Sequence, residues 1–202
     1  LNGKTTYAME GSIFIAGAGA QWLRDRMKFF KKAPETEKIV NKLKNNNGIY
    51  LVPAFTGLGA PHWNANSRGV LSGITRDTSP EEIVRATIEA VAYQTYDLFE
   101  AMKHDGLRPK VVKVDGGMVM NNWFSQFLSD VVNVKVLRPK VQETTAAGAA
   151  FMAGLKIGVY KSLKDISKNW HLDRNFSPKM KNNSRNLLIK GWSKAIDRAL
   201  IN

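Results

Sequence analysis

Apolar residues return at helical spacing between Ser79 and Gly106, and they form the clearest periodic pattern in the chain. The segment opens with the signals of a helix N-terminus, because Ser79 can cap the helix, Pro80 suits its first turn and Glu82 completes a capping box. The pattern predicts a long helix that buries one broad face and stops at the turn 104–106. The apolar face is formed by Ile83, Ala86, Ala90, Val91, Leu98 and Met102.

The rest of the chain alternates between strand-like and helix-like patterns, without an internal repeat. Because strands that alternate with helices usually pair in parallel and are covered by those helices, we predict an α/β fold with a mixed, mostly parallel sheet. The loop 54–66 is expected to lie entirely on the surface. The predicted strands span 4–10, 49–53, 69–75, 111–114 and 134–137, and the predicted helices span the second half of 11–25, then 34–43, 123–128, 144–155 and 184–201.

A glycine turn joins the predicted strand 111–114 to the helix that follows it. Asp115 is followed there by Gly116 and Gly117, which let the backbone approach a phosphate or a base without an intervening Cβ. The unpaired N–H groups at the start of the next helix favour negative charge, and Asn121 in its first turn could bond an adenine edge. The alternative is that the two glycines only form a tight turn, and for a lone motif of this kind the two interpretations stand about even.

The composition indicates a globular domain. The chain has 202 residues, 44% of them hydrophobic, and no cysteine, which excludes disulfides and fits a reducing compartment. No apolar run approaches the roughly 18 residues that cross a bilayer, and the first residues lack the apolar centre of a secretory signal. We therefore expect a cytoplasmic protein without a membrane partner. Because the chain begins at Leu1 and reaches strand-like residues at once, we also expect a fragment whose start lies upstream.

The net charge of +13 raises nucleic acid as a partner. The excess is concentrated in residues 155–202, which carry eleven Lys and Arg against three Asp. These cations are spread singly along predicted helix surfaces, whereas a binding stripe would more often cluster them. We therefore favour a solvated, lysine-rich surface and expect no nucleic-acid partner.

Five motifs, in order, resemble those of the FGGY carbohydrate kinases and together cover nearly the whole chain. The glycine pattern at 69–74 followed by Glu82 to Glu89 is similar to the second signature of that family. The loop 56–63, Thr-Gly-Leu-Gly-Ala-Pro-His-Trp, is similar to that of members that phosphorylate glycerol, whereas members acting on xylulose typically carry a Gly-Glu-Arg sequence there. The other three motifs are Glu10 to Asp25, Asp115-Gly116-Gly117, and Glu143 to Ala150.

The resemblance implies an actin-like, ribonuclease-H-like fold with ATP and glycerol held between two related domains. The γ-phosphoryl group of ATP, with Mg²⁺ as companion ion, would pass to a glycerol hydroxyl. Residues 1–202 would be the C-terminal nucleotide-binding domain, without the N-terminal domain and without the first strands of its own sheet. The general base, an Asp, and the side chains that hold glycerol would lie upstream of residue 1. We therefore expect a homo-oligomer in the whole enzyme, and an isolated chain that binds ATP or ADP weakly and does not phosphorylate glycerol.

The resemblance also assigns a role in ATP binding to five residues. Gly17 would approach the phosphates, Gln21 would contact the nucleoside, and Gly117 would line the adenine side with Met118 beside it. Asn121 would bond the base or the ribose. Met118 replaces the Ala that is common in the family, and no residue of the chain is expected to ligate a metal.

The residues themselves leave other interpretations open. Close helix packing explains Gly17 as well, and Gln21 fits an exposed helix position. Asn121 and Asn122 fit ordinary N-caps, and Glu143 to Thr145 fits a helix start. The lone loop residue His62 is expected to be structural. For the chain as a whole, the alternatives are another FGGY sugar kinase, such as one acting on xylulose, and a basic module that binds polyanions.

Overall fold

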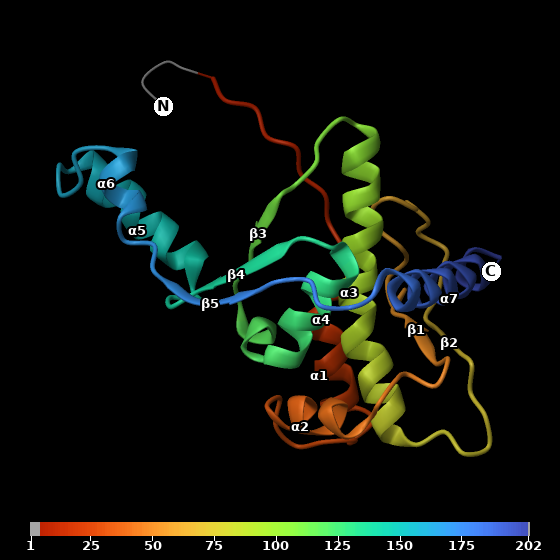
Figure 1. Cartoon of the computed structure of the whole chain (residues 1–202). Coiled ribbons are helices and arrows are strands. Elements are labelled where there is room, and N and C mark those ends of the chain that lie inside the picture. Colours follow the sequence, from red (N-terminus) through yellow and green to blue (C-terminus); the bar gives the residue numbers. More distant parts are fainter. Residues whose placement is uncertain (1–4, 202) are drawn as a thin grey trace.

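The computed structural model describes residues 5–201 and is organised around one long helix, α3 (Pro80–His104), as Figure 1 shows. Helices α1, α2 and α4 and strand β1 pack against α3. The bounds of the other elements are α1 (Gly17–Asp25), α2 (Glu35–Lys42), β1 (Tyr50–Val52), β2 (Val70–Ser72), β3 (Val111–Lys113), the 3₁₀ turn η1 (Gly117–Met120), α4 (Asn122–Val132), β4 (Lys135–Pro139), α5 (Thr144–Lys156), α6 (Leu163–Ser167), β5 (Leu172–Phe176) and α7 (Asn182–Leu200).

The helix predicted from the apolar pattern at 79–104 is confirmed as α3. Ser79 and Glu82 form the predicted capping box, in which the backbone N–H of Ser79 donates to Oε2 of Glu82 at 2.7 Å. The box satisfies N–H groups that a helix start otherwise leaves unpaired, and so it fixes where α3 begins. The helices predicted at 34–43, 144–155 and 184–201 are confirmed as α2, α5 and α7.

The strands within residues 5–201 form two small sheets. Strands β1 and β2 pair antiparallel, and the second sheet has the order β3-β4-β5. In that sheet β3 and β4 are parallel, whereas β4 and β5 are antiparallel. The mixed character that we predicted is confirmed. The parallel share is smaller than expected, since β3 and β4 are the one pair of strands in the described part that run parallel.

The core joins α3 to α4 and α7 through aromatic side chains. Tyr93 of α3 stacks on Trp192 of α7, with the ring centroids 5.3 Å apart. Tyr93 also meets Phe127 of α4 in an edge-to-face contact at 5.6 Å. Such aromatic pairs bury large apolar areas and contribute beyond area alone, so they hold the three helices in one arrangement.

A buried ionic network lies one turn before Tyr93 on α3. Glu89 is fully buried and pairs with Arg85, whose Nε lies 2.7 Å from its Oε1. Tyr93 and Asn46 donate to the other carboxylate oxygen of Glu89, at 3.0 Å and 3.2 Å. Burial raises the pKa of the Glu89 carboxyl, although Arg85 opposes the shift. The network ties the turn after α2 to the centre of α3.

Two predictions of local structure are wrong. Residues 5–10 form no strand and are exposed, and Lys4, where that predicted strand begins, lies outside the described residues. The loop 54–66 is not entirely at the surface, because Ala54 and Leu58 are buried in the core. Strand β5 and the short helix α6 are elements that the sequence pattern did not indicate.

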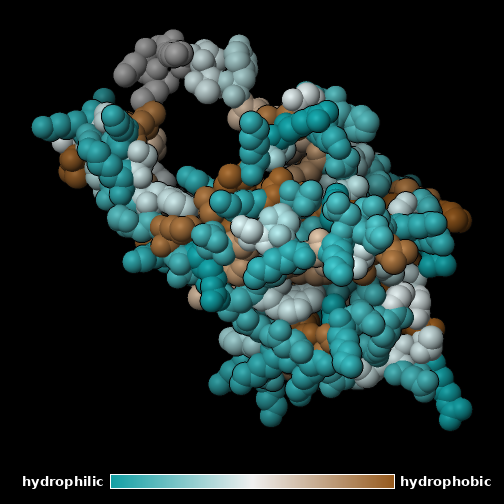
Figure 2. All heavy atoms as spheres, viewed as in Figure 1, coloured by the Kyte–Doolittle hydropathy of each residue, from teal (hydrophilic) through white to brown (hydrophobic). Residues whose placement is uncertain are grey.

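Helices α5 and α6 project away from α3 (Figure 1). Gly154 is the one buried residue of α5, although most of that helix is apolar. Met152, Ile157 and Val159 are exposed, and Figure 2 shows hydrophobic side chains at the surface of this projecting part. Within residues 5–201, none of the helices combines the length and the hydropathy needed to span a membrane.

Candidate functional site

A cavity of about 340 Å³ lies where α1, α2 and η1 meet α3. All five residues proposed from the sequence to bind ATP line it, although the segment that carries Gly17 and the segment that carries Gly117 lie far apart in the chain. Two glycine-bearing segments and the start of α4 therefore face one cavity. The predicted residues are Gly17, Gln21, Gly117, Met118 and Asn121, and the other lining residues are Ala20, Arg24, Ala33, Pro34, Thr36, Glu37, Ile88 and Met120.

The space around Gly17 and Gly117 shows whether each glycine is needed for packing against a neighbour. A Cβ added at either glycine would meet no atom within 4 Å, so neither is small because a neighbour presses on it. Gly19 is different, since its Cβ would lie 3.0 Å from Cγ2 of Thr87 on α3. The close helix packing that we considered for Gly17 is therefore performed by Gly19. Gly17 and Gly117 instead leave the cavity open.

The turn before Gly117 has its own requirement for glycine. Gly116 has φ of +81°, a conformation that a residue with a Cβ rarely adopts. The tight-turn interpretation of the glycine pair is therefore correct for Gly116. Gly117 has no such requirement, and it begins η1 and lines the cavity.

The N-terminus of α1 opens at the cavity without a side-chain cap. The first N–H groups of an α-helix have no partner within the helix and carry partial positive charge. Gly17 is the first residue of α1, and the exposed Gln21 follows one turn later on the same side. This arrangement is suited to an anionic group near Gly17.

Asn121 is the N-cap of α4, as one of the two interpretations predicted. Its Oδ1 accepts from the backbone N–H of Phe124 at 2.9 Å. Its Nδ2 donates to Oγ1 of Thr36 at 3.3 Å. Because an amide carries two N–H hydrogens, one donor of Asn121 stays available to a ligand in the cavity.

Helix α2 supplies lining residues that the sequence did not indicate. Thr36 is buried and receives the bond from Asn121, and Oε1 of Glu37 accepts from Asn122 through its backbone N–H at 3.2 Å and its Nδ2 at 3.0 Å. These contacts fix the start of α4 against α2. A threonine in the first turn of a charged helix was the available signal in the sequence, but it does not reveal the partner.

The cavity offers few groups to a metal ion. Glu37 is the one carboxylate among its lining residues, and residues 5–201 contain no group of three His, Cys, Asp or Glu side chains placed to hold a metal. Arg24 also lines the cavity, but it pairs with Asp25 at 2.7 Å. The residues present therefore do not form a magnesium site by themselves.

The remaining predicted motifs have structural roles. Thr144 begins α5, and its hydroxyl donates to the carboxylate of Asp115, so the helix-start interpretation of 143–145 is confirmed. Nε2 of His62 lies 3.3 Å from Oδ2 of Asp97, which also accepts from the indole N–H of Trp192 at 2.7 Å. His62 thus anchors its loop to the core rather than facing the cavity.

The chain is similar to known proteins over most of its length. The model of the family described as "FGGY family of carbohydrate kinases, C-terminal domain" matches residues 1–157. Glycerol kinase 1 of Pseudomonas aeruginosa is 54% identical over 198 residues, 98% of this chain, and a glycerol kinase of Clostridium botulinum is 51% identical over 201 residues, 99% of it. The chain spans 40% of the length of each.

Solved structures are similar as well. The glycerol kinase of Plasmodium falciparum, solved with ADP, superposes with a TM-score of 0.84 at 36% identity over 94% of this chain and 38% of that chain. A xylulose kinase from Lactobacillus acidophilus gives a TM-score of 0.76 at 22% identity over 93% of this chain and 38% of that chain, a likeness of fold alone. The fold predicted from the sequence motifs is thus confirmed. Since the family model covers most of the chain, the protein belongs to the FGGY carbohydrate kinases and carries their C-terminal domain.

Proposed function

We propose that residues 1–202 form one nucleotide-binding domain, the ATP-binding part of a kinase that phosphorylates glycerol. The observation that carries the proposal is the convergence of Gly17 and Gly117 on one cavity in which neither glycine serves packing. Phosphoryl transfer needs positioning and charge stabilisation more than covalent help, so a seat of backbone N–H groups and amide side chains is suited to ATP.

Each part of the cavity has a role in this proposal. The phosphates lie toward the uncapped start of α1 at Gly17, where the helix N–H groups favour negative charge. The base lies at the other wall, along Gly117 and Met118, and takes the free N–H of Asn121. Gln21 contacts the nucleoside between them. In this proposal Mg²⁺ is bound to the phosphates of the nucleotide, and its protein ligands belong to parts of the kinase outside this chain.

Glycerol is the substrate that the relatives support. The two bacterial glycerol kinases share about half of their aligned residues with this chain, whereas the xylulose kinase shares 22%. A kinase acting on xylulose is therefore the weaker candidate. The general base and the glycerol-holding side chains lie outside this chain in the proposal, so the chain by itself binds nucleotide weakly and turns over no glycerol.

Calorimetric titration with ADP tests the nucleotide site, with two variants of Asn121. Asn121→Asp keeps an oxygen that caps α4 and removes the amide donors, so it should weaken ADP binding at least about fivefold while leaving stability nearly unchanged. Asn121→Ala should weaken ADP binding and also lower the free energy of unfolding by about 1 kcal/mol. Unchanged ADP affinity in both variants would remove Asn121 from the site.

Substrate turnover is tested separately. A coupled assay of glycerol phosphorylation should give no turnover for residues 1–202 alone. Turnover by this chain would show that a general base lies within it, contrary to the proposal.

A further inference from the structure

Arg138 on β4 is one of the two buried arginines among residues 5–201, and it does not line the proposed nucleotide cavity. It is only 6% exposed. Removing a guanidinium from water is costly unless its N–H groups find partners. The partners of Arg138 therefore show what this buried charge holds in place.

The donors of Arg138 are divided between two parts of the structure. Its Nε donates to Oδ2 of Asp173 at 2.7 Å, which links β4 to β5. Its Nη1 donates to the carbonyl oxygen of Val119 at 2.8 Å and, at the longer distance of 3.4 Å, to that of Met120. One guanidinium thus joins the paired strands β4 and β5 to the end of η1.

The end of η1 is held from the core side. Val119 is buried, and its carbonyl oxygen also accepts from Oγ of Ser125 at 3.0 Å, so two donors fix this one oxygen. Because a peptide unit is planar, a fixed oxygen also fixes the orientation of the whole unit. Met118 precedes Val119 in the chain and Asn121 follows two residues later, and both line the proposed nucleotide cavity. Arg138 therefore fixes the turn that places these two residues.

We propose that Arg138 is a positioning residue for the base wall of the nucleotide site, which is the wall along Gly117 and Met118. The inference rests on the proposed nucleotide-binding function. Arg138 acts through η1 rather than on the nucleotide, because it does not line the cavity. A lysine would keep the positive charge beside Asp173, but its single ammonium group does not reproduce the planar fork of donors that serves both partners.

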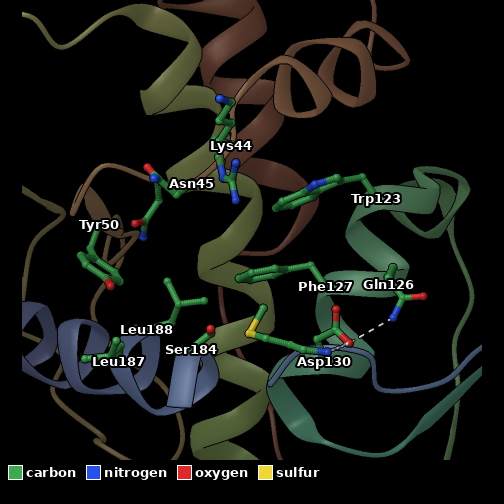
Figure 3. A pocket seen from close by; sticks show the side chains of 13 residues that line it. Lys44, Asn45, Tyr50, Trp123, Gln126, Phe127, Asp130, Ser184, Leu187 and Leu188 are labelled. Atoms are coloured by element: carbon green, nitrogen blue, oxygen red, sulfur yellow. Dashed lines mark hydrogen bonds between the residues drawn. The ribbon is translucent and has the colours of Figure 1, made fainter. Parts of the chain in front are cut away.

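The other buried arginine, Arg85 on α3, lines a second cavity. This cavity, of about 540 Å³, lies between α3, α4, α7 and the turn that follows α2, and it shares no lining residue with the proposed nucleotide cavity. Trp123 and Phe127 form one wall (Figure 3), with their rings stacked on each other at a centroid distance of 4.9 Å. The Arg85 guanidinium lies 5.0 Å from the ring centroid of Trp123. Arg85 thus supports packing at a different place.

Arg85 is a matched control for Arg138 because its polar partners are of the same kinds. Its Nε donates to the carboxylate of Glu89 at 2.7 Å, and its Nη1 donates to the carbonyl oxygen of Leu43 at 2.6 Å. Neither partner belongs to η1 or lines the proposed nucleotide cavity. A change at Arg85 therefore removes a buried fork of donors without loosening the base wall.

An NMR titration with ADP tests the role through Arg138→Lys and Arg85→Lys. Both changes keep the charge and should lower the free energy of unfolding. Arg138→Lys should in addition weaken ADP binding at least about fivefold, whereas Arg85→Lys should leave the affinity within about twofold. The Met118 amide shift, extrapolated to saturating ADP, should change in Arg138→Lys. That of Gly17, at the phosphate end, should stay the same.

Two further variants separate the contacts of Arg138. Asp173→Asn keeps an oxygen acceptor for Nε and leaves the bonds to η1 in place, so it should leave ADP affinity within about twofold. Ser125→Ala removes the second donor to the Val119 carbonyl oxygen, so it should weaken ADP binding at least about threefold and change the Met118 shift. Ser125→Ala loosens the same peptide unit even if Arg138→Lys does not fold.

Equal ADP affinities of Arg138→Lys and Arg85→Lys would overturn the role of Arg138. So would equal changes of the Gly17 and Met118 shifts, because a general distortion of the fold would move both. An unchanged Met118 shift in Ser125→Ala would also overturn it. Absence of ADP binding by the unsubstituted chain would instead contradict the proposed function, and the role of Arg138 with it.

Discussion

Gly17 and Gly117 are free of packing constraint in the protein's own structure, and this freedom distinguishes them from their neighbours. Gly116 is required by its backbone conformation and Gly19 by its contact with Thr87. A sequence cannot make this distinction, because all four are glycines in short turns or helices. The available space around each Cα is what supports the proposed role of Gly17 and Gly117 in ligand binding.

A matched pair of substitutions on α1 tests this assignment. Gly17→Val should leave the free energy of unfolding within about 0.5 kcal/mol and reduce ADP affinity at least about tenfold, because the side chain fills open cavity. Gly19→Val should instead destabilise the fold by about 1 to 3 kcal/mol through overpacking against Thr87. Urea unfolding and ADP titration measure the two effects. The interpretation is wrong if Gly17→Val destabilises as much as Gly19→Val.

The site residues that the motifs carried were predictable, and those on α2 were not. Gly17, Gln21, Gly117, Met118 and Asn121 were named from the sequence, and all five line the cavity. Thr36 and Glu37 were missed because their partners on α4 lie 85 residues away, a contact that arises from tertiary packing alone. The local sequence pattern contains no information on this contact between α2 and the start of α4.

At the scale of elements, the ends of α3 were the most predictable part of the fold. The capping box is a local device, so four consecutive residues suffice to place it. Strand β5 was missed because four of its five residues are exposed, which leaves no clear apolar alternation to detect. Residues 5–10 resembled a strand, yet an extended segment becomes a strand only when a neighbour pairs with it.

The capping box predicts a pH dependence of stability. The hydrogen bond from the backbone of Ser79, followed by the one from Asn47, lowers the pKa of Glu82 below its usual value. Ionised Glu82 therefore stabilises the fold at neutral pH, and this contribution is lost as the pH falls through the lowered pKa. Glu82→Gln keeps a capping side chain but does not titrate.

The free energy of unfolding of the unsubstituted chain should exceed that of Glu82→Gln at pH 7 by roughly 0.5 kcal/mol or more. This advantage should disappear toward pH 3. Urea unfolding at several pH values measures it. A difference between the two proteins that stays constant from pH 7 to pH 3 would contradict the assigned role.

Helix α5 should be the least protected of the longer helices. It buries Gly154 alone, whereas α3 buries residues along its first half. Few buried apolar contacts imply a low free energy of local opening. Hydrogen exchange followed by mass spectrometry should show amides of α5 exchanging at least about a hundredfold faster than those in 82–93. Equal protection of the two segments would mean that α5 is held by contacts absent from this structure.

The whole molecule places two cavities on either side of the start of α4. Asn121 lines the proposed nucleotide cavity and Trp123 lines the second cavity, so one short segment separates them. The fold class and the family were predictable from the order of five motifs, because each motif is local and their order restricts the topology. The second cavity was not, since its walls come from four parts of the chain that approach one another only in the folded molecule.

The charge of the molecule does not alter the proposed function. The net charge of the chain is +13, and the charged lining residues of the proposed nucleotide cavity are Arg24 and Glu37. An anion-binding function of the site therefore depends on helix N–H groups rather than on a basic patch.

The most direct test is an NMR titration of the amide-labelled chain with ADP, because NMR detects the weak binding that we expect. The amides of Gly17, Gln21, Gly117, Met118 and Asn121 should shift together and fit a single dissociation constant. The amide of Gly106, in the turn after α3, should not shift. If Gly17 and Gly117 respond with different affinities, or if neither shifts at about 10 mM ADP, the two glycine-bearing segments do not form one nucleotide site.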